Sequence, residues 1–535
     1  MTKTVLIVGS GPAAAGVALA CAAQRGVQVT VLDIGARLEP GRERARERLA
    51  ETTREQWTTA DLATVVEQPV ASERGALPQK RSFGSNFPFR DVGQLVGVTS
   101  SDDANDAVVS GAYGGFSNLW GAQVMPFPEA TLREWPIEVE EMRRHYAKVL
   151  EQIPFAAEPD DLADGFPLLA PAAPLPRVSE RTAAVLGRYE GRREEVKRRG
   201  VVVGRARLAL DSTRCVLCGL CMTGCPHLLI YSAAQTIESL RGKGAVTYLP
   251  GLLAVRVEED PDGATVVARE LENGRLRRFT ADRVFLATGG IGTTRLVAGS
   301  LGLARREIRL RESMQFVLPF LSLVPTPHDP RTCSDFTLNQ FNMAVALDGK
   351  SGDVAHLHFY TFNPSFEDRF PRVLRAGPGA SVGTQLLRRV SVAFGYLPSW
   401  ASPEPIVRVG KIEDRDSLPP IEISGDRLGR LGNSTLRTVL RRIASAAPAL
   451  DLWPILPMLR ISAPAKSYHW GGAFPHARDD HESELSSDPL GRVGPWQRIH
   501  AVDGSVLPSV AATTFTLTVM ANAHRIAETS LRDLA

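Results

Sequence analysis

Four cysteines stand close together near the middle of this 535-residue chain, in the string CVLCGLCMTGCPH. They are Cys215, Cys218, Cys221 and Cys225, and Pro226 follows the last of them. The C-x2-C-x2-C-x3-C-P spacing is typical of iron–sulfur proteins, because thiolates two residues apart on a tight loop can reach the corners of one cluster. Zinc sites more often pair two C-x2-C units that lie far apart in the sequence. The spacing therefore predicts a protein that moves electrons one at a time.

The number of irons and the fourth ligand stay open at this point. In two-cluster ferredoxins the last cysteine of such a run binds the second cluster, but this chain has a single run. Cys225 would complete a 4Fe-4S cluster, which we favour. The alternatives are a remote cysteine as the fourth ligand, or a 3Fe-4S cluster. Cys21 and Cys333 are the other thiols, and a lone cysteine usually fills space in a core.

The N-terminal residues have the pattern of a dinucleotide-binding site. Residues 4–8, TVLIV, are typical of a buried strand, and residues 9–14, GSGPAA, follow as G-x-G-x-x-A before an alanine-rich segment. Gly9 makes the turn, Gly11 lets a pyrophosphate approach the helix N-terminus, and Ala14 completes the motif. The next strand ends at Asp33, where an acid binds a ribose hydroxyl. These features predict a dinucleotide, and they do not separate FAD from NAD.

Length and composition limit the number of domains and the classes of protein to which this chain can belong. A chain of 535 residues exceeds one simple core, so two or more subdomains are expected. The hydrophobic fraction of 44% is ordinary for a globular protein, and no apolar run reaches the roughly 18 residues of a membrane span. A net charge of +3 without a basic block gives no indication of a nucleic-acid partner. The strand begins at once after MTK, without a charged and then apolar leader, which favours a cytoplasmic protein.

Three further segments carry a resemblance to a known family. Residues 114–120, GGFSNLW, resemble the second glycine-rich flavin motif of the glucose–methanol–choline (GMC) oxidoreductases, in the form of the pyranose oxidase and bacterial sugar dehydrogenase branch. Residues 286–293, LATGGIGT, resemble the strand and loop that return to the FAD domain of that family. The tail, from VDGSVLP at 502–508 to TLTVMA at 516–521, resembles its C-terminal strand and helix.

The resemblance implies FAD as the cofactor. It places Gly9 and Gly11 at the pyrophosphate and Asp33 at the adenosine ribose. It also implies contacts with the isoalloxazine, the ribityl chain and the rest of FAD for Gly114, Gly115, Ser117, Asn118, Asp503, Phe515 and Thr516. In some relatives a histidine of the second motif bonds covalently to the flavin. That position is Leu119 here, so non-covalent FAD is expected.

The same resemblance gives a catalytic pair. Oxidation of an alcohol by flavin needs a base for the hydroxyl proton, and histidine suits this because its pKa lies near neutrality. Tyr468-His469-Trp470-Gly471-Gly472 resembles the segment that carries the catalytic histidine of the family, so His469 is the expected base. The second catalytic position is histidine or asparagine in the family and is Thr514 here. Threonine is a poor base at pH 7, so Thr514 is expected to orient the substrate hydroxyl.

The expected fold is α/β: a GMC-type, Rossmann-like FAD domain, an α+β substrate domain with a mostly antiparallel sheet, and an iron–sulfur loop insertion. The FAD domain would comprise 1–126, 205–300 and 460–535, the loop 211–232, and the substrate domain 127–204 and 301–459. Alternating strands are expected at 336–347 and 354–362. Gln315, Asn339, His356 and His358 are candidates for contacts with substrate hydroxyls. A polar sheet face is a better interpretation of the two histidines than a metal site.

The sequence thus favours an FAD- and iron–sulfur-dependent dehydrogenase. Its substrate would be a sugar, a glycoside or an aminocyclitol sugar of antibiotic biosynthesis, oxidised by hydride transfer to flavin N5. Reduced flavin holds two electrons and a cluster takes one at a time, so electrons would leave to an external acceptor protein or a quinone. An alternative is an oxidase for a hydrophobic alcohol such as a sterol, with a structural cluster. A third is an electron-transfer flavoprotein without catalysis, against which His469 argues.

Overall fold

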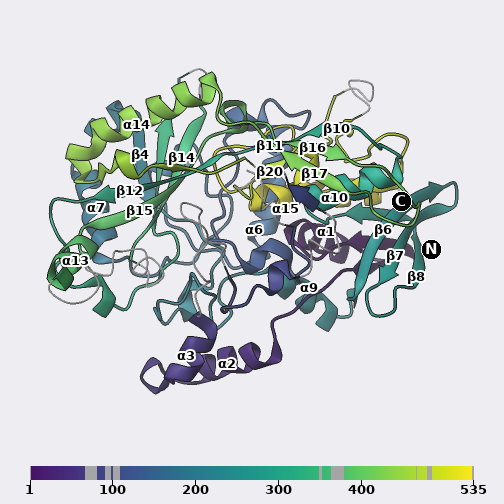
Figure 1. Cartoon of the computed structure of the whole chain (residues 1–535), viewed down its shortest axis with the longest axis horizontal. Helices are drawn as coiled ribbons and strands as arrows, with labels where there is room; N and C mark the ends of the chain where they lie inside the picture. The colour runs from purple at the N-terminus through teal and green to yellow at the C-terminus, as the bar shows by residue number, and fades with distance from the viewer. Residues whose placement is uncertain are drawn as a thin grey trace.

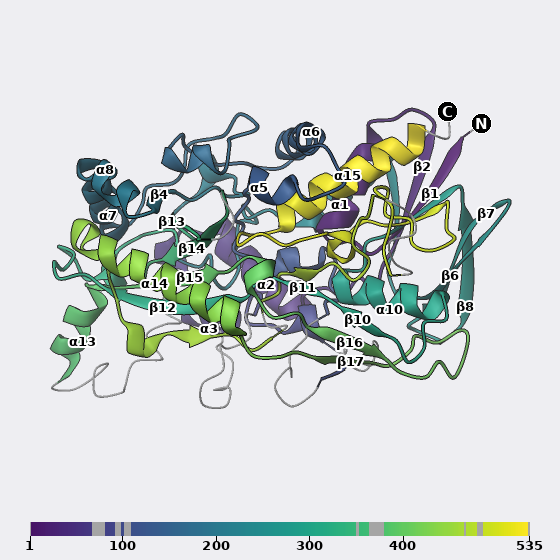
Figure 2. The same cartoon turned by 90° about the horizontal axis from the view of Figure 1, so that it is seen from above.

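The structure is a computed structural model that describes residues 2–66, 81–90, 98–100, 109–348, 352–362, 379–464, 467–478 and 485–532. Two lobes lie side by side, one built on a parallel sheet and the other on a larger antiparallel sheet (Figure 1). The two ends of the chain lie close together on the parallel lobe (Figure 2), where Lys3 Nζ donates a hydrogen bond to the Leu531 carbonyl at 3.1 Å.

The parallel sheet holds the dinucleotide motif. Its five strands run in the order β21-β9-β1-β2-β5, and every neighbouring pair is parallel. The central strand β1 is buried on both faces from Val5 to Val8, as its continuous apolar sequence predicts. The bounds are β1 Lys3–Val8, β2 Val27–Leu32, β5 Val246–Leu249, β9 Arg283–Leu286 and β21 Ile499–Ala501.

Two helices from opposite ends of the chain pack against each other over this sheet. They are α1 (Pro12–Ala22), which follows the glycine-rich turn, and α15 (Thr516–Arg532), the C-terminal helix. Gly16 sits at their closest approach, because a Cβ there would lie 2.3 Å from the Met520 carbonyl oxygen. The small residues of α1 thus serve helix packing as well as the nucleotide motif.

Gly16→Ala is therefore expected to destabilise the protein. The added methyl group would push α15 away from α1, and overpacking of this kind costs about 1–3 kcal/mol. Gly187→Ala is the matched control, since Gly187 lies exposed inside helix α7 (Glu180–Gly191) and no atom of the described residues lies within 4 Å of its Cβ position. That change should stabilise by about 0.5–1 kcal/mol. Thermal unfolding of the two variants decides, and equal melting temperatures would contradict the packing argument.

The antiparallel sheet forms the second lobe. Its strands run in the order β18-β12-β15-β14-β13-β4, with β19 paired to β12. Helices α7 (Glu180–Gly191) and α14 (Arg430–Leu450) pack on it around a core of Phe and Leu side chains. The expected strand at 336–347 begins at Phe341, and the one at 354–362 ends at Tyr360. The bounds are β4 Val201–Arg205, β12 Gln315–Leu321, β13 Phe341–Ala346, β14 Val354–Tyr360, β15 Val390–Tyr396, β18 Trp453–Pro454 and β19 Arg460–Ile461.

Smaller sheets complete the parallel lobe. One is a three-stranded antiparallel unit of β6 (Leu252–Asp260), β7 (Gly263–Glu270) and β8 (Leu276–Ala281). Another has the order β10-β16-β17-β3, with bounds Glu307–Arg309, Ile406–Val409, Ile421–Ser424 and Val98–Ser100. Ile308 and Ile423 of this sheet share a core with Leu6 of β1. Parts of 301–459 therefore pack with the parallel lobe, and the division into domains stays a prediction.

The remaining helices and short strands are distributed over both lobes. Helices α2 and α3 project together from one side of the molecule (Figure 1). In the part of the chain that the structure describes, no helix is long and apolar enough to cross a membrane. The bounds are α2 Pro40–Glu51, α3 Thr59–Val66, α5 Glu129–Leu132, α6 Val139–Leu150, α8 Arg193–Arg198, α9 Ala233–Gly242, α10 Gly290–Ser300, α13 Ala380–Leu387, β11 Arg311–Glu312 and β20 Trp470–Gly471.

Candidate active site and cysteine loop

The glycine-rich turn forms an open cradle at the N-terminus of α1. Gly9 has a φ of +100°, and a Cβ there would lie 2.5 Å from the carbonyl oxygen of Ala287, directly after β9. Only a glycine therefore fits at this position of the turn. A Cβ at Gly11 would meet no atom of the described residues within 4 Å. Gly115 of the second motif lies against this opening, because its Cβ would be 3.2 Å from Gly11 Cα. Backbone N–H groups and open space at a helix N-terminus fit a pyrophosphate.

Asp33 is held in place by two residues that the sequence analysis did not single out. It is buried, and it accepts hydrogen bonds from Ser10 Oγ and from the Tyr248 hydroxyl at 2.9 Å. Burial raises the pKa of this carboxyl group to about 7, and it outweighs the two hydrogen bonds, which act to lower the pKa. Ser10 Oγ in turn accepts the Gly114 N–H at 3.0 Å. The acid at the end of β2 is thus tied to both glycine motifs.

The side chains of the second glycine motif hold its loop in shape. Ser117 Oγ donates to the Gly114 carbonyl and accepts the Ala233 N–H at 2.9 Å. Asn118 Nδ2 donates to the Tyr113 and Gly115 carbonyls at 2.9 and 2.8 Å. These bonds occupy groups that the resemblance assigns to FAD, so the flavin contacts of Ser117 and Asn118 stay predictions. The half-buried Leu119 has no atom that could form a histidyl link.

Three segments that are distant in sequence meet beside this loop. Asp503 is buried, caps the turn Gly504–Val506 by accepting the Ser505 N–H at 3.0 Å, and accepts a hydrogen bond from Thr293 Oγ1. A Cβ at Gly471 would lie 2.0 Å from the Gly504 carbonyl oxygen, and one at Gly504 would lie 3.1 Å from Phe515 Cε2. The histidine segment, the LATGGIGT segment and the tail are therefore in direct contact.

His469 lies at this junction with its ring between two aromatic side chains. The ring centroid is 4.7 Å from that of Tyr396, nearly parallel to it, and 5.3 Å from that of Phe515. The backbone is fixed as well, since the His469 N–H donates to Ser467 Oγ at 3.1 Å and its carbonyl accepts the Ser313 N–H at 2.9 Å. Burial lowers the pKa of His469 to about 4. The imidazole is therefore neutral at pH 7 and able to accept a proton.

Thr514, the predicted partner of His469, donates its hydroxyl proton to the Gln123 carbonyl at 2.9 Å. The oxygen of that hydroxyl keeps lone pairs for a second group, which suits an orienting role. Its neighbour Thr513 is buried, and its Oγ1 lies 3.0 Å from His356 Nδ1.

The two histidines of β14 form a buried chain that leads toward His469. His358 Nε2 lies 3.1 Å from His356 Nδ1, and the ring of His358 is 5.2 Å from that of Tyr396. Burial lowers the pKa of His356 to about 3, and that of His358 well below its usual value. Gln315 also reaches this group, because its Nε2 donates to the Tyr396 hydroxyl at 2.9 Å. Tyr396, which sequence reasoning missed, thus joins the predicted base to two of the predicted substrate contacts.

Asn339, the fourth predicted substrate contact, is fully buried, and its Nδ2 donates to the Phe341 carbonyl at 2.9 Å. Its Oδ1 is buried without a hydrogen-bond partner among the described residues. The structure gives this residue a bond to the sheet backbone rather than to the His469 group.

The four cysteines of the run line one small cavity, together with Leu210, Val216, His227, Leu229, Ile230 and Phe336. The loop turns back on itself through left-handed backbone at Leu217, Gly219, Gly224 and Leu228. Backbone N–H groups point at sulfur: Thr337 N–H donates to Cys221 Sγ at 3.4 Å, and the amides of Leu217 and Leu220 bond Cys215 and Cys218.

This donor set fits a metal cluster. Burial raises the pKa of Cys215 and Cys225, and that of Cys218 to about 12. Thiolates that are buried next to one another need a cation to be stable, and N–H groups directed at sulfur further stabilise them. No group of three or more His, Cys, Asp or Glu side chains in the described ranges is arranged to hold a metal ion as it stands. The iron–sulfur cluster therefore stays a prediction.

Two neighbouring elements brace the cysteine loop. Arg46 of α2 is buried, and it donates a hydrogen bond to the Pro226 carbonyl at 2.8 Å. The Phe83 N–H donates to the Thr223 carbonyl at 2.6 Å, and a Cβ at Gly224 would collide with the Phe83 ring at 2.7 Å. Helix α2 also packs against the loop through its apolar side chains, because Ala45 and Leu49 share one apolar cluster with Leu220 of the loop.

The flavin motif and the cysteine loop are bonded to each other. Trp120 Nε1 at the end of GGFSNLW donates to the Tyr231 carbonyl at 2.8 Å. Ser117 bonds Ala233, as described above, and its Oγ lies 3.2 Å from Ser232 Oγ. Residues 231–233 stand at the end of the predicted loop 211–232, separated from Cys225 by five residues, and lead into α9. The two motifs are therefore neighbours in space although about 100 residues separate them along the chain.

No family model matches this chain, and no curated protein is similar to it in sequence at a significant level. Solved structures are similar in fold. Pyridoxine 4-oxidase from Mesorbium loti has a TM-score of 0.59 at 14% identity, over 98% of this chain and 99% of that one. Formate oxidase from Aspergillus oryzae RIB40, in a variant made to study FAD modification, has a TM-score of 0.60 at 13% identity, over 99% and 98%. A second formate oxidase structure has a TM-score of 0.59 at 14% identity, over the same shares.

These similarities cover nearly the whole of each chain. They confirm the coarse fold that the sequence predicts, an α/β fold with a Rossmann-like parallel sheet and an antiparallel second sheet. At 13–14% identity they show the fold alone. The cysteine loop, the sugar dehydrogenase branch and the individual site residues stay predictions.

Proposed function

We propose that this chain is an FAD- and iron–sulfur-dependent dehydrogenase that oxidises a hydroxyl group of a sugar, a glycoside or an aminoglycoside-like molecule. One observation carries this proposal. The GGFSNLW loop touches the Gly11 cradle on one side and is hydrogen-bonded to residues 231–233, next to the cysteine run, on the other. A dinucleotide in the cradle and a group held by the four thiolates would therefore be close neighbours. An electron relay needs that arrangement.

The similar solved structures support the flavin part of the proposal. Both proteins are oxidases by name, and one is a protein whose FAD modification has been studied. The same fold, with a glycine cradle and a buried acid at the end of β2, is compatible with FAD in this chain. When bound, FAD would supply a hydride acceptor and the cluster a one-electron carrier.

The residues of the chain supply the proton chemistry. His469 is neutral, and its ring is held in one orientation between Tyr396 and Phe515, so it can accept the proton of a substrate hydroxyl. Thr514 bonds the Gln123 carbonyl and offers its oxygen to the same hydroxyl. Gln315 and His358, which contact Tyr396, are the polar groups best placed to recognise further substrate hydroxyls.

The activity should depend little on pH across the physiological range. A base whose pKa is lowered to about 4 is already deprotonated at pH 6 and stays so as the pH rises. The rate of substrate-driven flavin reduction should therefore be level from pH 6 to 8 and fall only as the pH approaches about 4. Single-turnover rates against pH test this. A fall centred between pH 6 and 7 would show a histidine with an ordinary pKa.

A second candidate, an oxidase with a structural cluster, is favoured by one observation. The similar solved structures named above are oxidases. The two candidates differ in their acceptor: a dehydrogenase should turn over slowly with oxygen alone and rapidly with a one-electron acceptor.

The cofactor content tests the proposal directly. Protein purified without oxygen should contain FAD, about four irons per chain with acid-labile sulfide, and a broad iron–sulfur absorption beneath the flavin bands. Acid precipitation should release the flavin into solution, because Leu119 stands where a covalent link would need histidine. Zinc without sulfide would overturn the cluster, and flavin that stays with the precipitate would overturn the non-covalent prediction. A screen of sugars and glycosides with a dye acceptor would then identify the substrate.

A further inference from the structure

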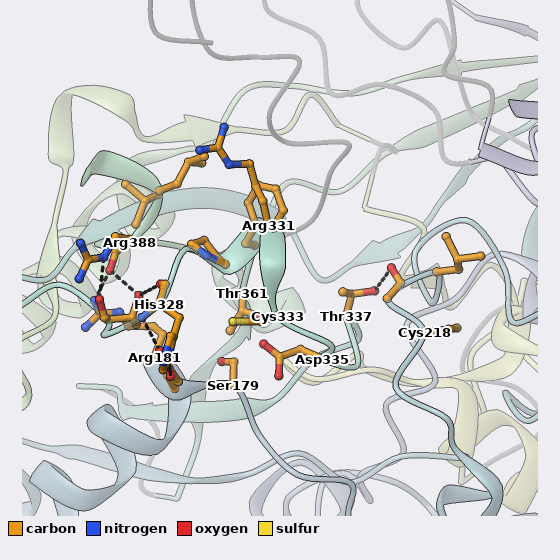
Figure 3. A pocket seen from close by; sticks show the side chains of 18 of the residues that line it. Ser179, Arg181, Cys218, His328, Arg331, Cys333, Asp335, Thr337, Thr361 and Arg388 are labelled. Carbon is orange, nitrogen blue, oxygen red and sulfur yellow. Dashed lines mark hydrogen bonds and ion pairs between the residues drawn. The ribbon is translucent and has the colours of Figure 1, made fainter. Parts of the chain in front are cut away.

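A second cavity, of about 240 Å³, borders the cysteine loop. Arg181 and Arg388 lie at one end with His328 beside them, while Cys218 lies at the other end beyond Thr337, Asp335 and Cys333 (Figure 3). Trp57, Leu220, Phe362, Leu387 and Val390 provide apolar walls. The lining therefore changes along the cavity, from charged side chains at one end to Cys218 at the other, with apolar side chains in the walls.

Cys218 connects this cavity to the cysteine site. Of the four cysteines of the run, it alone lines both cavities among the residues that the structure describes. The shared wall is rigid, because Thr337 Oγ1 donates to the Gly219 carbonyl at 3.0 Å and Thr337 N–H donates to Cys221 Sγ. A molecule in the second cavity would lie against Cys218, one of the four residues that would hold the cysteine-bound group.

The cavity is separate from the site around His469. Val390 lines the cavity and stands at one end of β15, while Tyr396, which stacks on His469, stands at the other end. Six residues of strand span about 20 Å. Substrate at His469 and a molecule in this cavity would therefore not compete for space.

The charge of the lining favours a ligand whose oxygen atoms accept hydrogen bonds. Four arginines line the cavity, Arg54, Arg181, Arg331 and Arg388, against the two acids Glu180 and Asp335. His328 is paired with Glu180. Arg181 is 95% buried, and its Nε has no hydrogen-bond partner among the described residues. A buried guanidinium donor without a partner is costly, so an acceptor atom is expected there.

We propose that this cavity binds the external electron acceptor and that the acceptor is a quinone. The proposal rests on the proposed function and names the partner of its last step. The carbonyl oxygens of a quinone accept hydrogen bonds from the guanidinium groups, and its planar ring fits between apolar walls. With FAD and a cluster bound, two electrons from the alcohol would reach the quinone one at a time at the Cys218 end of the cavity, two protons would come from solvent, and the quinone would leave as the quinol. The arginines also stabilise the negative charge that the ring carries after the first electron.

Binding is tested first, on the protein as purified, by calorimetric titration with a naphthoquinone sulfonate. Arg388→Gln removes a charge at the cationic end, and Val390→Trp fills the apolar middle. Each change should weaken quinone binding about tenfold or more. The first removes a charge-assisted hydrogen bond, and the second occupies the space that the ring of the quinone would need. Arg214→Glu is the control, because this exposed residue flanks Cys215 but does not line either cavity that the described residues form. It should bind like the unchanged protein.

Turnover supplies the second arm, with cytochrome c as a competing acceptor that is too large for the cavity. The ratio of quinone reduction to cytochrome c reduction should fall about tenfold in Arg388→Gln and in Val390→Trp. Equal affinity in all four proteins, or an equal loss of both acceptors, overturns the assignment. If the quinone binds as expected but no alcohol reduces the flavin, the quinone site is supported and the proposed dehydrogenase function is contradicted. Failure of the site and failure of the function therefore give different results.

Discussion

His469→Ala should slow the reduction of bound flavin by substrate about 100-fold or more, the usual effect of removing a general base. The neutral imidazole would no longer be present to take the hydroxyl proton, while the glycine cradle proposed to hold the cofactor lies elsewhere in the lobe. The measurement is the loss of flavin absorbance in an anaerobic stopped-flow experiment with a saturating substrate. FAD content and melting temperature of the variant establish that it folds.

Thr514→Ala is the matched comparison for His469→Ala. It removes a hydroxyl that donates to the Gln123 carbonyl and is proposed to orient the substrate, so its effect on flavin reduction should be the smaller of the two. A Thr514 variant that is slower than the His469 variant would reverse the two roles. A His469 variant that reduces at the normal rate would move this chain toward a flavoprotein that only transfers electrons.

Cys218→Ser should abolish turnover with a one-electron acceptor while substrate still bleaches the flavin. The first half of the reaction needs only the cofactor and His469, which lies in another part of the molecule, and the second half needs the route through the thiolates. Serine cannot replace a soft thiolate in a cluster, and Cys218 is the sulfur that borders the second cavity. Steady-state rates with a dye acceptor, set beside single-turnover flavin reduction, separate the two halves.

Stability is the confounding effect in that experiment, because loss of a metal site can unfold its loop. Cys21→Ala is the control for the loss of a thiol, since Cys21 is fully buried in the alanine-rich helix α1 and lies outside the run. It should keep the iron content and the turnover. A Cys218→Ser protein that is folded, lacks iron and turns over normally would make the cluster structural and favour the oxidase.

The arrangement of the aromatic groups has a consequence for specificity. Tyr396 contacts His469, Gln315 and His358 together, so one side chain links the expected base to the expected recognition groups. The buried pair His356–His358 ends at Thr513, the residue before Thr514. A change in how a substrate is bound at this sheet would therefore be expected to affect both proposed catalytic positions.

The sequence by itself determined the local motifs of this protein. The strand at 4–8, the turn at Gly9 and Gly11 and the helix after it are set by neighbouring residues, because apolar runs, positive φ and helix starts are short-range properties. The cysteine spacing is equally local: four sulfurs within eleven residues can line one cavity only if the loop turns back, and the glycines at 219 and 224 permit that. The order of these motifs also predicted the fold class that the similar structures confirm.

Only the tertiary structure decided which distant residues meet. Three contacts show this: Tyr396 with His469, Tyr248 with Asp33, and Trp120 with Tyr231. They depend on sheet register and on the packing of segments that lie 73 to 215 residues apart along the chain. A one-residue slip in β15 would turn Tyr396 to the other face, and nothing near it in the sequence fixes that register. The cavity that Cys218 shares with the arginines has the same origin, because its walls come from six separate stretches of chain.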